Sequence, residues 1–95
     1  MDLSSQKERW AVWAVQARNF AKRENYTDAV ARMNLVRKSI EETLAEVTDP
    51  EDREELQALL LRAEEQLADL RTRYEAWRSE IAARRQQTID GAAEE

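Results

Sequence analysis

The chain has 95 residues, of which 37% are charged, with a formal net charge of −5 and only one glycine and one proline. This length suits one domain with a modest core, and so few turn-forming residues favour long helices over strands. The nearly balanced charge does not point to nucleic acid or an anionic membrane, and the absence of histidine and cysteine excludes imidazole bases, thiol nucleophiles, disulfides and Cys/His metal sites.

The first predicted helix covers residues 5–24. Ser5 and Glu8 fit a capping box, in which the two side chains satisfy backbone N–H groups that the first turn leaves without partners. The large and small apolar side chains then follow 3-4-3 spacing: Trp10, Trp13, Ala17 and Phe20. This spacing places them on one helical stripe, which we expect to face the rest of the protein.

The second predicted helix covers residues 28–47. Thr27 and Asp28 can cap and charge its start. Its apolar stripe continues for about five turns and consists of Val30, Met33, Val36, Ile40, Leu44 and Val47. The short connection to the first helix predicts a helical hairpin.

The third predicted helix covers residues 50–89. Asp49 can cap it, and Pro50 suits the first helical position because its missing N–H costs nothing there. No further glycine or proline precedes Gly91, so this helix reaches about 58 Å, against roughly 30 Å for each of the other two. Gly91 is a plausible stop, and we expect residues 90–95 to be a frayed tail.

The apolar residues of the third helix alternate steps of four and three, as in a heptad seam: Leu56, Leu60, Ala63, Leu67, Leu70, Tyr74, Trp77 and Ile81. After Leu70 the flanking residues are mostly charged or alanine, as expected where three helices give way to two. We therefore predict that the distal half of this helix has no partner within the chain. Its partner-binding residues would be Leu70, Tyr74, Trp77 and Ile81.

The three elements together predict an all-α fold, in which residues 1–89 form one domain with an up-down-up arrangement of helices. In this arrangement Phe20 is expected near Leu67 and Leu70. The long third helix would extend past the hairpin like one strand of a coiled coil.

Seven hairpin residues match the order and spacing of large and small positions in a tetratricopeptide-type repeat: Trp13, Ala17, Phe20, Tyr26, Ala29, Met33 and Val36. Residues 10–41 resemble one such repeat. The resemblance implies hairpin geometry, with Ala17 and Ala29 allowing the helices to approach closely. The hairpin with its third helix is also similar to microtubule-interacting-and-transport-type domains.

Neither a catalytic residue nor a cofactor or metal site is predicted. Adjacent carboxylates such as Glu41–Glu42 point about 100° apart on a helix, so solvated helix faces explain them better. Five arginines surround Tyr74 and Trp77, a pattern that can hold phosphates and stack bases: Arg71, Arg73, Arg78, Arg84 and Arg85. However, Asp69–Arg73 and Glu80–Arg84 have the spacing of i,i+4 ion pairs, which favours salt bridging over nucleic-acid binding.

The leading interpretation is a non-enzymatic interaction protein, an adaptor or structural subunit. It would associate with itself or with a partner helix through the distal part of the third helix. Because residues 51–70 are acidic and residues 71–88 basic, the charges favour an antiparallel homodimer. The alternative is a chaperone similar to small acidic secretion chaperones, binding an amphipathic client segment. With no cysteine, secretory leader or long apolar run in the sequence, we expect a cytoplasmic protein without a membrane partner.

Overall fold

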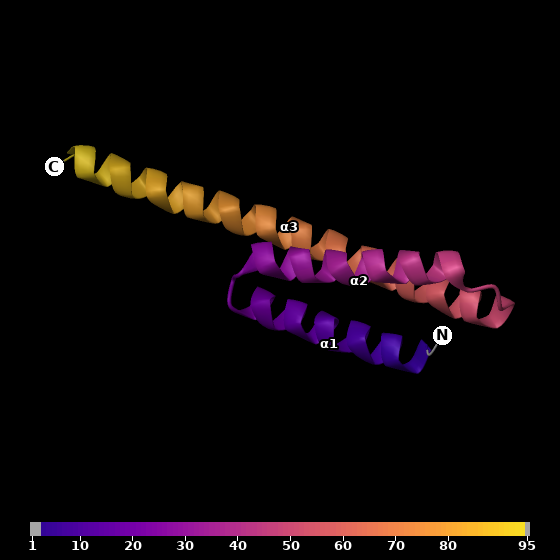
Figure 1. Ribbon diagram of the computed structural model, residues 1–95. Helices are drawn as coiled ribbons and strands as arrows, with labels where there is room; N and C mark the ends of the chain where they lie inside the picture. Colours follow the sequence, from indigo (N-terminus) through magenta and orange to yellow (C-terminus); the bar gives the residue numbers. More distant parts are fainter. Residues whose placement is uncertain (1–2, 95) are drawn as a thin grey trace.

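The computed structural model describes the backbone of residues 3–94 and the side chains of residues 3–86. These residues form three helices and no strand: α1 (Leu3–Lys22), α2 (Tyr26–Glu46) and α3 (Pro50–Glu94). α1 and α2 are antiparallel, and α3 runs back along α2 and continues past the α1–α2 turn (Figure 1). The predicted all-α, up-down-up fold with a long third helix is confirmed.

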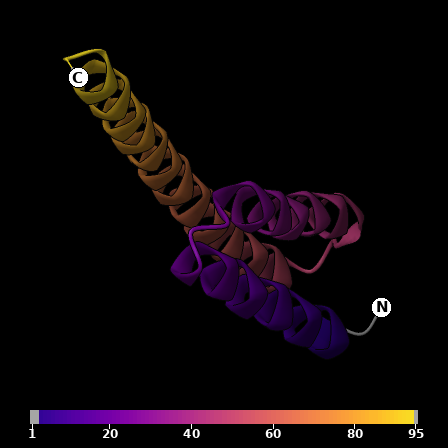
Figure 2. The same cartoon turned by 90° about the vertical axis from the view of Figure 1, so that its left-hand side faces the viewer.

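α2 is the central helix of the molecule. It packs along both α1 and α3, whereas α1 and α3 approach each other less closely. Figure 2 shows α3 leading away from the hairpin beyond the α1–α2 turn. The molecule therefore measures 69 × 17 × 14 Å, and its radius of gyration of 18.5 Å exceeds the roughly 12 Å of a compact chain of this length.

α1 begins at Leu3, which is earlier than the predicted start at Ser5. Ser5 lies within the first turn, so the predicted capping box does not mark the beginning of the helix. Leu3 packs against the buried core and extends the apolar stripe of α1 by two turns beyond Trp10. Burial of this extra residue gives a physical reason for the earlier start.

The α1–α2 turn is closed by a Schellman motif without glycine. The N–H of Asn25 donates to the carbonyl of Phe20 at 2.9 Å, and the N–H of Glu24 donates to that of Ala21 at 3.0 Å. Glu24 occupies the left-handed position of this motif, with φ of 60°. Glycine is usual there because any Cβ atom is crowded in that conformation.

α2 is capped by Asn25, which lies two residues before Thr27, the first of the predicted caps. The side-chain oxygen of Asn25 accepts a hydrogen bond from the N–H of Asp28 at 3.5 Å, and its amide donates to the Asp28 carboxylate at 2.7 Å. Thr27 and Asp28 lie inside the first turn, where the negative charge of Asp28 still favours the helix dipole.

The α2–α3 connection is held by one arginine. Arg53 donates from Nη1 to the carbonyls of Leu44 and Val47, both at 2.8 Å, and so satisfies acceptors at the end of α2. The Asp49 carboxylate accepts a long 3.4 Å hydrogen bond from a backbone N–H at the start of α3, as expected for its capping position. α3 begins at Pro50, as predicted.

α3 runs to Glu94, beyond the predicted end at residue 89. Residues 90–94, predicted as a frayed tail, are part of the helix, and Glu95 lies outside the described residues. A single glycine within a helix costs only about 1 kcal/mol relative to alanine, and Gly91 is followed by two alanines with the highest helix propensity.

The buried core takes residues from all three helices: Trp10, Ala17, Ala21, Ala29, Met33, Val36, Ile40, Leu56, Ala63, Leu67 and Leu70. Among the predicted hairpin residues, Trp13, Phe20 and Tyr26 are half-buried at the edge of this core. The buried residues of α1 are Trp10, Ala17 and Ala21, so Ala21 is buried where Phe20 was expected, and Trp13 is half-buried like Ala14. Small side chains fit this position because α1 and α2 lie close together.

Phe20 is half-buried and packs against the edge of the core. It lines a hollow with Ala31 and Leu35 on one flank of α2. Leu70 lines a separate hollow with Met33 on the α3 side. The two hollows share no lining residue, and the expected proximity of Phe20 to Leu67 and Leu70 stays a prediction.

Candidate interaction site

Three aromatic side chains gather where α3 passes the α1–α2 turn, and we call them the aromatic cluster: Tyr26, Tyr74 and Trp77. The ring centroid of Tyr26 lies 6.3 Å from that of Tyr74 and 5.8 Å from that of Trp77. The Tyr74 and Trp77 rings are stacked at 6.1 Å, with 22° between their planes. These separations lie within the favourable range for aromatic pairs.

Glu24 fastens the α1–α2 turn to α3. The indole Nε1 of Trp77 donates a hydrogen bond to Glu24 Oε2 at 3.1 Å. A glycine at position 24 would fit the left-handed backbone more easily, but it could not accept this bond. Glu24 therefore contributes to the contact between the hairpin and α3, although its backbone conformation is strained.

This contact changes where the uncovered part of α3 begins. Leu70 is buried in the core, and Tyr74 and Trp77 are half-buried within the aromatic cluster. Of the four residues predicted to bind a partner, only Ile81 lies beyond the α1–α2 turn. The uncovered stretch begins after Trp77 and not after Leu70, because Glu24 and Tyr26 reach further along α3 than expected.

We call residues 78–94 the free segment of α3. It continues about 25 Å past Trp77, and both views show it leading away from α1 and α2 (Figures 1 and 2). In its described part, residues 78–86, Ile81 is half-buried and the other side chains are exposed. The ion pair between Arg84 and Glu80, at 2.5 Å, has a spacing that supports an exposed helix.

Three of the five arginines near the aromatic cluster are engaged within the chain: Arg73, Arg78 and Arg84. Arg73 lies 3.8 Å from the Asp69 carboxylate and over the Tyr26 ring at 5.7 Å, so both predicted i,i+4 ion pairs are present. Arg78 lies over the Tyr74 ring at 5.6 Å. These cation–π contacts use the faces on which a nucleic acid base would have to stack.

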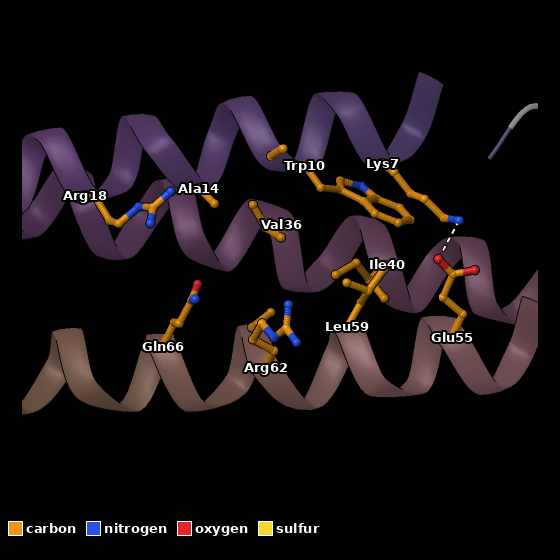
Figure 3. A pocket seen from close by; sticks show the side chains of 12 residues that line it. Lys7, Trp10, Ala14, Arg18, Val36, Ile40, Glu55, Leu59, Arg62 and Gln66 are labelled. Carbon is orange, nitrogen blue, oxygen red and sulfur yellow. Dashed lines mark ion pairs between the residues drawn. The ribbon is translucent and has the colours of Figure 1, made fainter. Parts of the chain in front are cut away.

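A groove runs between α1 and α3, with α2 as its floor (Figure 3). It has a volume of about 360 Å³, and its apolar lining includes Trp10, Ala11, Ala14, Val36, Ile40, Leu59 and Ala63. Trp10 is fixed in the groove because its indole Nε1 donates to the Ser39 hydroxyl at 2.8 Å. The groove exists because α1 and α3 pack on α2 without closing on each other.

An ion pair spans one end of the groove. Lys7 of α1 and Glu55 of α3 form an ion pair at 2.6 Å across it (Figure 3). Near this end, partial burial of Asp52 raises the pKa of its carboxyl, and repulsion by and hydrogen bonding to Asp49 add to the effect. The positive charge of Lys7 partly offsets the rise.

Two further cations line the groove from opposite walls, Arg18 from α1 and Arg62 from α3 (Figure 3). Neither guanidinium makes an ion pair with any residue that the structure describes. Apolar side chains lie between them. This part of the groove therefore offers two available positive charges beside an apolar surface.

In the part of the chain that the structure describes, no three His, Cys, Asp or Glu side chains gather as a metal site would require. Glu41 instead pairs with Arg37 at 2.9 Å along the surface of α2.

None of the described helical stretches has the length and apolar character needed to cross a membrane.

The sequence analysis missed Glu24, Arg18 and Arg62. Glu24 could have been suspected because residues 23–25 connect two helices without a glycine, so some other residue must adopt the left-handed conformation. Arg18 directly follows the core residue Ala17, and Arg62 directly precedes the core residue Ala63. A position next to a core residue on a helix often lines the edge of an interface, but the sequence alone does not show which helix lies opposite.

Comparison of the chain with protein families, curated proteins and solved structures found no match. The interpretation of the aromatic cluster, the free segment and the groove therefore depends on their own geometry and chemistry.

Proposed function

We propose that this chain is a non-enzymatic protein–protein interaction module, a small adaptor or structural subunit. It associates with a second copy, or with a helix of another protein, through the distal part of α3. The free segment is the observation that carries this proposal, because it extends about 25 Å beyond the hairpin (Figure 1). Helices in proteins draw most of their stability from packing on an apolar face, so a partner would stabilise this segment.

The apolar anchor of the proposed contact is Ile81, together with the uncovered edges of Tyr74 and Trp77. Full burial of one such side chain contributes about 1.5–3 kcal/mol, whereas association costs roughly 4–15 kcal/mol. Tyr74 and Trp77 are already half-buried within the chain, so they contribute less than a fully exposed residue would. The proposed self-association is therefore weak and depends on concentration.

Charge supports an antiparallel arrangement of two α3 helices. Residues 51–70 are rich in acids and residues 71–88 in arginine, so antiparallel chains bring opposite charges together. Parallel chains would instead align like charges along the whole contact. Raised salt should weaken the association, because these charges are exposed to solvent.

Sedimentation equilibrium over a wide concentration range tests the proposal. We expect a monomer–dimer equilibrium that Ile81→Asp abolishes, because the substitution places a charge in the apolar contact. Val12→Asp is the matched control, since Val12 is 55% exposed on α1, a helix from which the free segment leads away (Figure 1). A monomer at every concentration, or equal effects of the two substitutions, would contradict self-association through this segment.

A small acidic chaperone is the second candidate, in which the free segment captures an amphipathic client helix. The half-buried Ile81 within an otherwise polar helix favours this candidate, since one short apolar stripe suits a transient contact. A chaperone would be a monomer that gains helical content only with its client. Metal-dependent turnover in hydrolase and nuclease screens would contradict both candidates.

The likeness of residues 10–41 to a tetratricopeptide-type hairpin, and of all three helices to a microtubule-interacting-and-transport-type domain, remains part of this proposal. The complete burial of Ala17 and Ala29 supports the close helix approach that the first likeness implies. We also propose a cytoplasmic location, which is consistent with a chain that contains no cysteine.

A further inference from the structure

The groove between α1 and α3 is a second surface, separate from the free segment. We propose that it binds an acidic amphipathic helix of another protein. Bound there, the helix would lie over α2 and between α1 and α3, in the place of a fourth helix. This site goes beyond the proposed contact of the free segment and does not require it.

The shape of the groove suits a helix. α1 and α3 both pack on α2 but leave a gap between themselves, so the two walls run in the same general direction (Figure 3). Three alanines form parts of the walls: Ala11, Ala14 and Ala63. Such short side chains allow another helix to approach within the 8–10 Å that is usual for packed helix axes.

The length of the groove limits the size of its occupant. Lys7 and Arg18 mark its two ends on α1, and Glu55 and Gln66 do so on α3. Each pair is separated by about 16 Å of helix, or three turns. The occupant is therefore a helix of about three turns, with an apolar stripe that contacts Ala11, Ala14 and Leu59, which are exposed or half-buried in the lining.

The charge of the groove selects an acidic occupant. Glu55 is already paired with Lys7, whereas Arg18 and Arg62 have no carboxylate partner among the described residues. A carboxylate on each flank of a bound helix would pair with one of these guanidinium groups. Hydrogen bonds between such charged groups are about twice as strong as those between neutral groups.

The same charge argues against a second copy of this chain as the occupant. The described part of the free segment carries Arg78, Arg84 and Arg85 against one acid, Glu80. In the groove these arginines would face Arg18 and Arg62. Like charges placed together across an interface disfavour the complex, so a helix of opposite charge is preferred.

Two designed peptides of about 14 residues test the proposal against the full-length chain by isothermal titration calorimetry. Both carry leucines at i, i+3, i+7 and i+10; one has glutamate and the other lysine at the flanking positions. We expect the glutamate peptide to bind and the lysine peptide not to bind. Arg18→Gln and Arg62→Gln should each weaken binding of the glutamate peptide about tenfold.

Arg71→Gln is the matched control, because Arg71 is exposed on α3 and does not line the groove. It should leave peptide binding unchanged. Ala14→Trp should abolish binding by filling the groove, provided that its unfolding transition shows an intact fold. The proposal is overturned if the glutamate peptide does not bind at millimolar concentration, if both peptides bind equally, or if the three arginine variants behave alike.

Ile81→Asp separates this site from the free segment. If the groove is the binding site, the Ile81→Asp variant binds the glutamate peptide with the affinity of the unsubstituted chain. Loss of peptide binding in this variant would indicate that the peptide binds the free segment, and it would overturn the groove proposal. Loss of self-association with retained peptide binding would support both proposals independently.

Discussion

Glu24 combines two features that single residues rarely share, a left-handed backbone and a side-chain bond to a distant helix. Its φ of 60° costs about 1 kcal/mol relative to glycine. The hydrogen bond that its carboxylate accepts from the Trp77 indole N–H offsets part of this destabilisation. An intramolecular hydrogen bond contributes about 0.5–1.5 kcal/mol, so the two effects are of similar size.

This balance predicts that Glu24→Gly changes stability little in the unsubstituted chain. In a Trp77→Phe background, where the indole N–H is absent, the same change should stabilise the protein by about 1 kcal/mol, because only the backbone strain is removed. Urea unfolding of the four proteins in this double-mutant cycle measures the difference. Equal effects of Glu24→Gly in the two backgrounds would show that the carboxylate does not hold Trp77.

At the residue level, the sequence predicted buried hairpin residues correctly but missed the contact between Glu24 and Trp77. Trp10, Ala17, Ala29, Met33 and Val36 were all predicted to pack within the hairpin, and all are buried. Glu24 could not be recognised as a contact of Trp77, because 53 residues separate them and the contact exists only once α3 lies beside the turn.

At the scale of elements, α1 faces α2 with alanines and holds its larger side chains at the edges. Ala17, Ala21 and Ala29 are almost fully buried, whereas Trp13 and Phe20 are only half-buried. The predicted stripe of Trp10, Trp13, Ala17 and Phe20 has the same period as the stripe of Trp10, Ala14, Ala17 and Ala21, whose members are buried or packed against the core. Periodicity alone therefore could not decide between two neighbouring stripes, and the close approach of the helices selected the smaller residues.

The close packing of the hairpin predicts that Ala21→Leu destabilises the protein by about 1–3 kcal/mol, because three extra carbons have no space between α1 and α2. Ala45→Leu is the matched control, since Ala45 is exposed on α2 and the substitution keeps a good helix former. The free energy of unfolding in urea measures both. If Ala21→Leu were as stable as Ala45→Leu, the hairpin would be looser than the structure indicates.

Element boundaries were predicted within a few residues, and the differences have local causes. Asn25 caps α2 earlier than Thr27 would, which brings Tyr26 into the first turn. Because Tyr26 then lies beside Tyr74 and Trp77, the hairpin covers more of α3 than the sequence indicated. The groove could not be predicted at all, since it depends on how far α1 and α3 stand apart across α2.

At the scale of the whole molecule, the three helices leave α3 in two different environments. Its proximal half is packed on α2 and contains the buried residues Leu56, Ala63, Leu67 and Leu70. Its described distal part, residues 78–86, has one half-buried apolar side chain, Ile81. Local stability should follow this difference, because opening of a helix costs more where it buries more apolar surface.

Amide hydrogen exchange measures this difference along α3. In dilute solution we expect slow exchange at residues 56–70, where opening approaches global unfolding, and much faster exchange at residues 78–86, with the change near Trp77. If the free segment associates as proposed, protection at residues 78–86 should rise with protein concentration in the unsubstituted chain and not in Ile81→Asp. Uniform protection through residue 86 in dilute Ile81→Asp would contradict the division of α3 at Trp77, because a helix without a neighbour has no packing to resist its opening.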